Sequence, residues 1–368
     1  MPLLQSSLFM LAALGSAASV PAREVPAAVP APAIAAAQAA ANAFFTDPAL
    51  GETRALIVMQ DGKRVYERYA PGYGPGNRFI SWSMAKSVTS TLAGALVADA
   101  RLDLDAPAPV PEWRKTPGDP RAAITLRQLL HMTSGLRHEE TGPKVEGSDT
   151  NRALFSDKSG DILAHAVAAP LESQPGAIFE YSTLTTMILA DIVQRTLAPG
   201  ATTPAARRTA TRDFIVRRLS GPAGMPSLLC EYDPKGTLLG GSFCHATARD
   251  WVNFGQLYLD NGVVAGRQVV SPTWVSFVRT PSPAEPGYAG QFWLNRARTG
   301  KDAALFPEQG PIDAYAAIGH LGQYVLIVPS KRLVVVRLGK TQDEMLQPVR
   351  TALGRLVNAY PNAPPPPR

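Results

Sequence analysis

Strand-like segments lie near both ends of this 368-residue chain, and the long stretch between them has the pattern of helices. Near the N-terminus, residues 55–59 and 64–69 flank Asp61-Gly62, a dipeptide typical of β-hairpins. Near the C-terminus, residues 324–328 and 333–338 are apolar runs joined by a short turn. The pattern predicts an α+β fold, in which an antiparallel sheet built from the N- and C-terminal segments is flanked by helices and a mostly helical second lobe is inserted.

One two-lobed domain is expected over residues 33–360, with a sheet lobe at 33–100 and 225–360 and a helical lobe at 101–224. A cleft between lobes is a preferred place for a ligand. Helices are predicted at 33–45, 84–99, 125–132, 151–168, 183–197, 204–219, 247–261, 269–279 and 343–360. A second hairpin is predicted from 227–232 and 240–244, and turns are predicted at 315–322.

The composition is that of a globular protein, with 45% hydrophobic and 18% charged residues. The formal net charge is +6, but the 36 Lys and Arg residues are scattered along the chain. Nucleic-acid-binding proteins cluster such residues, so we expect no nucleic-acid partner. After the first 22 residues, no stretch approaches the roughly 20 apolar residues that a membrane span needs.

The N-terminal segment resembles a secretory signal peptide at residues 1–22, with cleavage options after Ala18 or Ala22. No Lys or Arg precedes Arg23, so the usual basic start is missing. Residues 23–32 are predicted to be a linker rich in proline and alanine, and residues 361–368 a disordered tail. We expect an exported protein, periplasmic or secreted.

The two cysteines, Cys230 and Cys244, fall on the predicted second hairpin, where antiparallel neighbours could meet. A disulfide suits an oxidising compartment, but two buried free thiols are an equal alternative. His131 and His165 are expected to pack or cap helices, and His138 to lie on an exposed turn beside two glutamates. None of them has the spacing of metal ligands, so we expect neither a metal nor another cofactor.

The strongest candidate for chemistry is Ser83, which is followed three positions later by Lys86. Residues three apart share one face of a helix, so the lysine amine could take the serine proton. The apolar run that follows predicts a buried helix. The Ser-x-x-Lys pattern is the first motif of class A β-lactamases and penicillin-binding proteins, but alone it also fits an ordinary helix start.

Two later segments add possible partners. Tyr181 precedes a predicted helix, and the run from His320 to Gln323 leads into a predicted strand. In this order the segments resemble the serine β-lactamase and penicillin-binding-protein superfamily. The likeness is to its class C β-lactamase branch, with the family VIII carboxylesterases and the 6-aminohexanoate-dimer hydrolases. Residues 129–136 and 246–257 also resemble that branch.

The resemblance implies that Ser83 is the acylated nucleophile and Lys86 its base partner. It implies that Tyr181 shuttles protons, and we expect the Lys86 ammonium to stabilise its phenolate. His320 would stand at the Lys-Thr-Gly position, and the backbone N–H groups of Ser83 and Gln323 would form the oxyanion hole.

The expected substrate contacts are Trp82, Thr183 and Gly322. Tyr288, Phe292 and Trp293 could also line an acyl pocket, though core packing is the alternative for at least half of this aromatic set.

The departures from the family concern the substrate. Thr183 replaces the asparagine of class C β-lactamases, and His320 replaces their lysine. Thr141 occupies the place of a tyrosine that assists amide cleavage in the nylon-oligomer hydrolases. We therefore expect a serine hydrolase acting on esters of small or medium acyl groups. The alternatives are an amide hydrolase acting on a nylon-type oligomer, a D-amino-acid peptide or a β-lactam, and a non-catalytic ligand sensor. The oligomeric state stays open.

Overall fold

A six-stranded antiparallel sheet joins the two ends of the chain, as predicted. The computed structural model describes residues 31–142, 147–156 and 160–364, so the expected signal peptide and nearly all of the linker lie outside it. The sheet order is β2-β1-β11-β10-β9-β8. Its strands are β1 (Glu52–Gln60), β2 (Lys63–Tyr69), β8 (Trp293–Leu294), β9 (Tyr315–Gly319), β10 (Gln323–Val328) and β11 (Leu333–Lys340).

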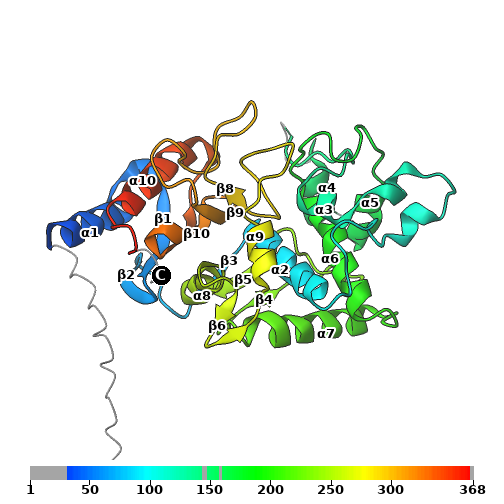
Figure 1. Cartoon of the computed structure of the whole chain (residues 1–368), viewed down its shortest axis with the longest axis horizontal. Coiled ribbons are helices and arrows are strands. Elements are labelled where there is room, and N and C mark those ends of the chain that lie inside the picture. The colour runs from blue at the N-terminus through cyan, green and yellow to red at the C-terminus, as the bar shows by residue number, and fades with distance from the viewer. Residues whose placement is uncertain (1–30, 143–146, 157–159, 365–368) are drawn as a thin grey trace, which may run out of the picture.

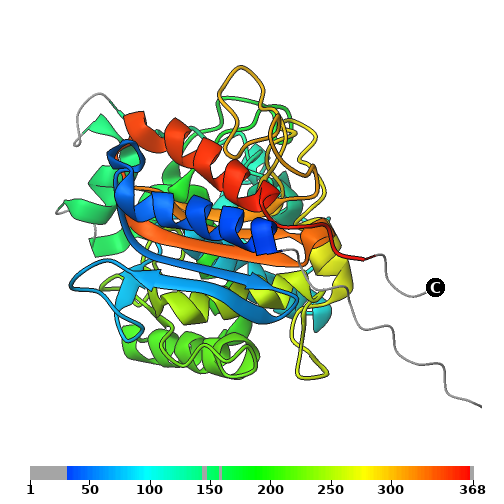
Figure 2. The same cartoon turned by 90° about the vertical axis from the view of Figure 1, so that its left-hand side faces the viewer.

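Helices cover both faces of this sheet, which explains why its central strands are apolar throughout. Alternate residues of a strand point to opposite faces. Val335 packs toward α1 (Ala31–Thr46) and α10 (Leu346–Asn358), which Figure 2 shows side by side across one face. Val334 and Val336 pack in the other core, which contains α8 (Ala248–Leu259) and α2 (Met84–Ala98).

The helical lobe lies on the far side of α2 from the sheet (Figure 1). It contains α3 (Leu126–Leu130), α4 (Asp149–Phe155), α5 (Ile162–Ala168), α6 (Thr183–Leu197) and α7 (Pro204–Ile215), which continues into a π-helical turn at Val216–Ser220. Buried α6 packs against α2, α3, α5 and α7. The helix predicted over 151–168 is wrong as a single element, because α4 ends at Phe155 and α5 begins at Ile162.

A smaller sheet, in the order β3-β5-β4, connects the segment before Ser83 to the two cysteines. Its strands are β3 (Arg78–Ile80), β4 (Leu229–Cys230) and β5 (Cys244–Thr247). Cys230 and Cys244 are opposite each other in the pairing and form a disulfide, which decides between the two alternatives left open by the sequence.

Other elements differ from the prediction in extent. The turns predicted at 315–322 are wrong in part, because β9 occupies the first five of those residues. Its small residues Ala316 and Ala317 are poor strand formers, which hid the strand. The predicted helix at 269–279 is shorter, as α9 (Pro272–Phe277), and a short hairpin precedes it, formed by β6 (Val263–Val264) and β7 (Arg267–Gln268). A separate 3-10 turn at Asp343–Met345 precedes α10.

Two findings bear on the tail and on membranes. Residues 361–364 have no regular secondary structure, yet the Ala363 N–H donates to the Ser330 carbonyl oxygen at 2.9 Å. Within the described residues, no helix combines the length and the apolar character required to span a bilayer.

Candidate active site

Ser83 stands at the N-terminal end of α2, after a sharp change in backbone direction. The preceding residue, Trp82, has a φ of 43°, a left-handed conformation that costs a residue other than glycine roughly 1–2 kcal/mol. Ser81 fixes the path of the chain into α2. Its N–H donates to the Cys244 carbonyl oxygen at 2.7 Å, and its Oγ accepts from the Cys244 N–H at 3.0 Å. Ser83 makes no capping bond with its side chain, so its hydroxyl is available for chemistry.

Lys86 is buried and its amine faces three oxygen atoms. Its Nζ lies 3.0 Å from Ser83 Oγ, 2.7 Å from Thr183 Oγ1 and 2.8 Å from the Gly241 carbonyl oxygen. Burial penalises the ammonium and lowers the pKa of Lys86 to about 8, against a smaller opposing effect of Glu140. A large fraction of neutral amine is therefore present in mildly alkaline solution, within reach of the Ser83 proton.

Tyr181 completes the group from the loop before α6. Its ring centre lies 4.8 Å from Lys86 Nζ, and its hydroxyl interacts with that of Ser83. Desolvation and the charge of Glu140 raise the pKa of Tyr181 well above its usual value of 10. The raised pKa favours the phenol over the expected phenolate, and a phenol can donate a proton rather than remove one.

Close backbone packing holds the acceptors around Lys86. A side chain at Gly241 would place its Cβ 2.8 Å from Thr183 Cγ2, so only glycine allows this approach. Hydroxyls along α2 fix the helix itself, since Ser87 and Ser90 donate to the carbonyl oxygens of Gln291 and Gly290 at 2.7 and 2.8 Å. The nucleophile is thus carried by a helix that is bonded to its surroundings on several sides.

Strand β9 supplies the nearby sheet edge, and the residue on its free edge is Ile318. The Asn295 N–H donates to the Ala314 carbonyl oxygen at 2.9 Å, so the backbone polar groups of residue 314 face the β8 side. Residues two apart in a strand point their backbone groups in the same direction, so the N–H and C=O groups of Ile318 also face the β8 side. Ile318 lies beyond Ala316, the last residue in this direction that pairs with β8. A Cβ at Gly319 would lie 2.2 Å from the Ser81 carbonyl oxygen, so this end of β9 lies against the backbone that leads to Ser83.

Gln323 occupies a different place from the one predicted. It pairs with Gly319 at the start of β10, which lies between β9 and β11 and has no free edge. Its side-chain amide donates to the His320 and Gly339 carbonyl oxygens at 3.1 and 2.7 Å, which stabilises the turn. The expectation that its N–H forms the oxyanion hole is therefore wrong, because that N–H lies inside the hairpin.

Gly322 is also a turn residue. Its φ is 78°, and a Cβ would lie 2.6 Å from a guanidinium nitrogen of buried Arg337. That guanidinium accordingly binds the Gly322 carbonyl oxygen at 2.7 Å. Gly322 therefore has a structural role in the turn, and its contact with a substrate stays a prediction.

His320 and Trp82 lie together at the rim. The side chain of His320 is 51% exposed, and its ring centre is 5.4 Å from that of Trp82. Among the contacts of the described residues, none joins His320 to Ser83, Lys86 or Tyr181. Trp82 also contacts Phe243, with ring centres 5.9 Å apart, and Phe243 contacts Phe155 of α4 at 5.7 Å. These four rings form an aromatic wall beside the nucleophile.

A second aromatic cluster surrounds Tyr181. The ring centres of Tyr288 and Trp293 lie 5.9 and 5.3 Å from that of Tyr181. Phe292, by contrast, packs against Tyr258 at 4.8 Å inside the core. The predicted aromatic set is therefore divided, with Trp82, Tyr288 and Trp293 near the catalytic group and Phe292 serving the core.

Thr183 and Glu140 bind each other beside Lys86, a contact that the sequence did not predict. Thr183 Oγ1 donates to Glu140 Oε1 at 2.7 Å while accepting from Lys86, so its hydroxyl is engaged within the protein. Glu140 was missed as a site residue, because it lies more than 50 residues from Lys86 in a loop of uncertain register. The one signal in the sequence was a carboxylate close behind the Thr-Ser-Gly-Leu segment at 133–136.

The three histidines at positions 131, 138 and 165 have structural contacts. His138 is buried rather than exposed, with Nε2 3.0 Å from the Ala166 carbonyl oxygen and Nδ1 3.1 Å from Ser182 Oγ. His131 stacks on Phe277, and burial lowers its pKa to about 4. His165 lies on α5, 3.6 Å from an Asp149 carboxylate oxygen. Across residues 31–142, 147–156 and 160–364, no cluster of metal-ligating side chains is present.

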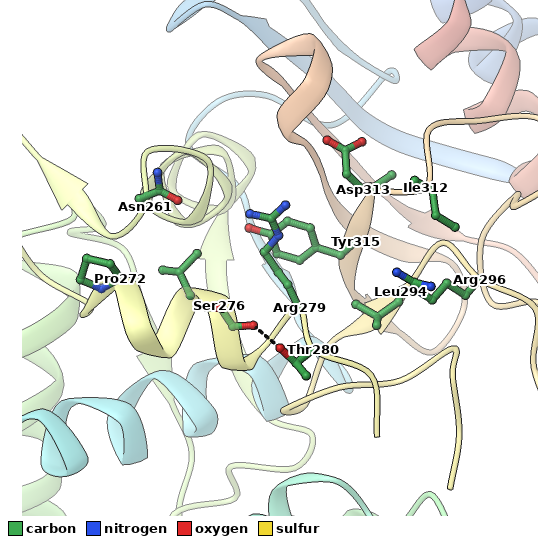
Figure 3. Close-up of a pocket in the computed structure, with 12 residues that line it drawn as sticks. Asn261, Pro272, Ser276, Arg279, Thr280, Leu294, Arg296, Ile312, Asp313 and Tyr315 are labelled. Atoms are coloured by element: carbon green, nitrogen blue, oxygen red, sulfur yellow. Dashed lines mark hydrogen bonds between the residues drawn. The ribbon is translucent and has the colours of Figure 1, made fainter. Parts of the chain in front are cut away.

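A separate hollow of about 410 Å³ lies between α9 and the start of β9. Figure 3 shows Arg279 beside the Tyr315 ring there, with its guanidinium carbon 5.4 Å from the ring centre. None of the predicted site residues lines this hollow. The catalytic group at Ser83 therefore lies elsewhere.

Known proteins resemble this chain in sequence or in fold. The chain is 26% identical over 312 residues to 6-aminohexanoate-dimer hydrolase of Paenarthrobacter ureafaciens, covering 79% of this chain and 73% of the relative. Its fold matches a family VIII carboxylesterase with a TM-score of 0.64 at 15% identity, covering 90% and 98% of the two chains. It also matches EstCE1, a hydrolase with promiscuous acyltransferase activity, with a TM-score of 0.58 at 16% identity and coverages of 89% and 98%.

Residues 52–359 match the Beta-lactamase family model, which is most of the chain. The Ser-Lys pair at the start of α2 and the sheet shared by both chain ends agree with that match. The protein therefore belongs to the Beta-lactamase family and is a serine hydrolase.

Proposed function

We propose that the protein hydrolyses carboxylic esters of small or medium acyl groups through an acyl-enzyme at Ser83. The observation that carries the proposal is the 3.0 Å contact between Ser83 Oγ and the desolvated Lys86 amine. A serine hydroxyl becomes a competent nucleophile when such a base removes its proton.

In the first step, neutral Lys86 takes the Ser83 proton as Oγ bonds to the ester carbonyl carbon. The negative charge that develops on the carbonyl oxygen is stabilised by the backbone N–H groups of Ser83 and Ile318, the residue on the free edge of β9. The bond to the alcohol then breaks, and the alcohol oxygen receives a proton either directly from the Lys86 ammonium or from the Tyr181 phenol, which the Lys86 ammonium then reprotonates. Both routes leave Lys86 neutral for the next step. In the second half of the reaction, neutral Lys86 takes a proton from water as the water oxygen bonds to the acyl carbon. The bond to Ser83 Oγ then breaks, Oγ regains a proton, and the acid is released.

One observation and one chemical argument favour esters over amides. Thr141, at the place of the amide-assisting tyrosine, is exposed and carries no phenol. An ester also releases a better leaving group, so it depends less on an additional proton donor. The aromatic wall of Phe155, Phe243, Trp82 and His320 offers apolar surface to an acyl or alcohol group.

The test compares the wild type with Ser83→Ala on p-nitrophenyl acetate, butyrate and octanoate. We expect measurable turnover by the wild type and a loss of at least about a hundredfold in the variant. Unchanged ester hydrolysis by Ser83→Ala would refute the proposal.

Amide hydrolysis is the second candidate, favoured by the likeness to 6-aminohexanoate-dimer hydrolase over most of both chains. The same preparations should be given 6-aminohexanoate dimer, a D-amino-acid peptide and nitrocefin. A kcat/KM for one of these above that for every ester would reverse the preference. A non-catalytic sensor would turn over none of them and would form no adduct with a fluorophosphonate.

We further propose that the protein works in an oxidising compartment outside the cytoplasm. The Cys230–Cys244 disulfide supports this, because such bonds are rare where thiols are kept reduced. N-terminal sequencing of protein recovered from the periplasm or medium should find a start after Ala18 or Ala22. Full-length protein confined to the cytoplasm would contradict it.

A further inference from the structure

Glu140 is the one carboxylate within hydrogen-bonding reach of the Lys86 group in the described structure, although it does not touch Lys86 itself. Its Oε1 accepts from Thr183 Oγ1 at 2.7 Å, and Thr183 Oγ1 in turn accepts from Lys86 Nζ at 2.7 Å. Its Oε2 accepts from the Thr183 N–H at 2.6 Å and from Thr150 Oγ1 at 2.7 Å. Three donors from two elements therefore fix the carboxylate in place.

The directions of these bonds determine where the lone pair of neutral Lys86 points. A hydroxyl has a single proton, and that of Thr183 is committed to Glu140, so Thr183 can only accept from Lys86. The Gly241 carbonyl oxygen can likewise only accept, at 2.8 Å from Lys86 Nζ. A neutral amine has two N–H groups, and both are taken by these two acceptors. The third direction, toward Ser83 Oγ at 3.0 Å, is left for the lone pair.

We propose that Glu140 is a positioning residue of the active site, which acts through Thr183 to aim the Lys86 lone pair at the Ser83 hydroxyl. Without the carboxylate, the Thr183 proton could turn to Lys86 and occupy the lone pair that has to receive the Ser83 proton. The inference rests on the proposed function, because it assumes that Lys86 is the base of Ser83.

Glu140 is the group that places negative charge near Lys86. On α2 itself Lys86 is the one ionisable residue. From the loop before α6, Tyr181 faces it as a neutral phenol, since its pKa is raised, and the pKa of Tyr288 behind it is raised as well. His138 is buried near Ser182, and burial lowers its pKa, so it is neutral at pH 7 and above.

The other packing elements place their charges elsewhere. Asp191 of α6 is paired with Arg195 and Arg207. Arg218, beyond α7, is paired with Asp99 at the far end of α2. On β9 the one ionisable group is Tyr315, whose hydroxyl donates to the Tyr258 carbonyl oxygen at 3.3 Å.

Glu140→Gln is the decisive variant, because it reverses the hydrogen-bond direction with little change in shape. The two donors on Oε2 require the amide oxygen at that position, so the amide nitrogen has to face Thr183 Oγ1 and donate to it. Thr183 is then free to donate to Lys86. Glu139→Gln is the matched control, since Glu139 is the adjacent glutamate and its side chain is exposed.

The experiment records kcat/KM for p-nitrophenyl butyrate against pH for wild type, Glu140→Gln and Glu139→Gln, with circular dichroism to confirm folding. We expect the alkaline plateau of Glu140→Gln to fall roughly tenfold to a hundredfold, as expected for a base that is poorly oriented. Its inflection should also move to lower pH, because Glu140 raises the pKa of Lys86. Glu139→Gln should match the wild type in both respects.

A second pair of variants separates the hydroxyl from the charge. Thr183→Val removes the hydroxyl that connects Glu140 to Lys86 but keeps Glu140. The alkaline plateau of kcat/KM for Thr183→Val should therefore fall below that for Thr183→Ser, which keeps a hydroxyl. A Glu140→Gln profile that coincides with that of Glu139→Gln overturns the inference. So does a lower plateau with an unmoved inflection, which a purely structural role would produce. Activity that persists in Ser83→Ala would instead refute the proposed function, whatever Glu140 does.

Discussion

The rate of ester hydrolysis is predicted to rise about tenfold from pH 7 to pH 9 and then to level off, because Lys86 has to lose a proton before it can act on Ser83. With a pKa of about 8, the neutral amine is about one eleventh of the enzyme at pH 7 and about ten elevenths at pH 9. An ordinary lysine with a pKa near 10.5 would give a rise of about a hundredfold over the same range, without a plateau. The size of the rise therefore reports the desolvation of Lys86.

The assay measures kcat/KM for p-nitrophenyl butyrate at constant ionic strength, read at the isosbestic wavelength of p-nitrophenol. Rates with Ser83→Ala are subtracted at each pH to remove spontaneous hydrolysis. Because kcat/KM reports ionisation of the free enzyme, the inflection belongs to Lys86 without bound substrate. An inflection well below pH 8 would point to a base other than Lys86, and a flat profile would contradict a titrating base altogether.

Three further predictions concern the surrounding structure. The double variant Cys230→Ala/Cys244→Ala should lose about 3 kcal/mol of unfolding free energy in urea, given a sequence separation of 14 and the loop-closure entropy; a midpoint equal to that of the wild type would contradict this. Tyr288→Phe should unfold with the same or up to about 1 kcal/mol higher free energy, because its buried hydroxyl has no partner among the described residues; a clear destabilisation would show a missed bond. Gly241→Ala should cost about 1–3 kcal/mol and also lower kcat/KM, because its Cβ would press on Thr183 beside Lys86; wild-type kinetics would refute this packing.

The sequence predicted the sheet because its strands carry strong local patterns. Strands β1, β10 and β11 carry apolar runs, and turn residues separate β1 from β2 and β10 from β11. Strand β9 was missed because Ala316 and Ala317 favour no strand by themselves. It is held in the sheet by its pairing with β10, an interaction that local patterns do not contain.

The catalytic pair could be predicted because Ser83 and Lys86 are three residues apart on one helix. Tyr181 needed the family resemblance, since nothing local links it to α2. Gln323 was assigned wrongly because β9 was not recognised: Gln323 begins the internal strand β10, whereas the free edge belongs to β9 on the other side of the turn. Glu140 was out of reach for a related reason: its role depends on a loop that packs against the start of α6.

The central claim is that Ser83 forms a covalent acyl-enzyme, and it is tested most directly by mapping the modified residue. The enzyme would be treated with a fluorophosphonate, digested, and examined by peptide mass spectrometry, beside Ser83→Ala and Lys86→Met. We expect one adduct on Ser83 in the wild type, none in Ser83→Ala, and labelling slowed by at least about a hundredfold in Lys86→Met. An adduct on another residue, or equal labelling of Lys86→Met, would contradict the account.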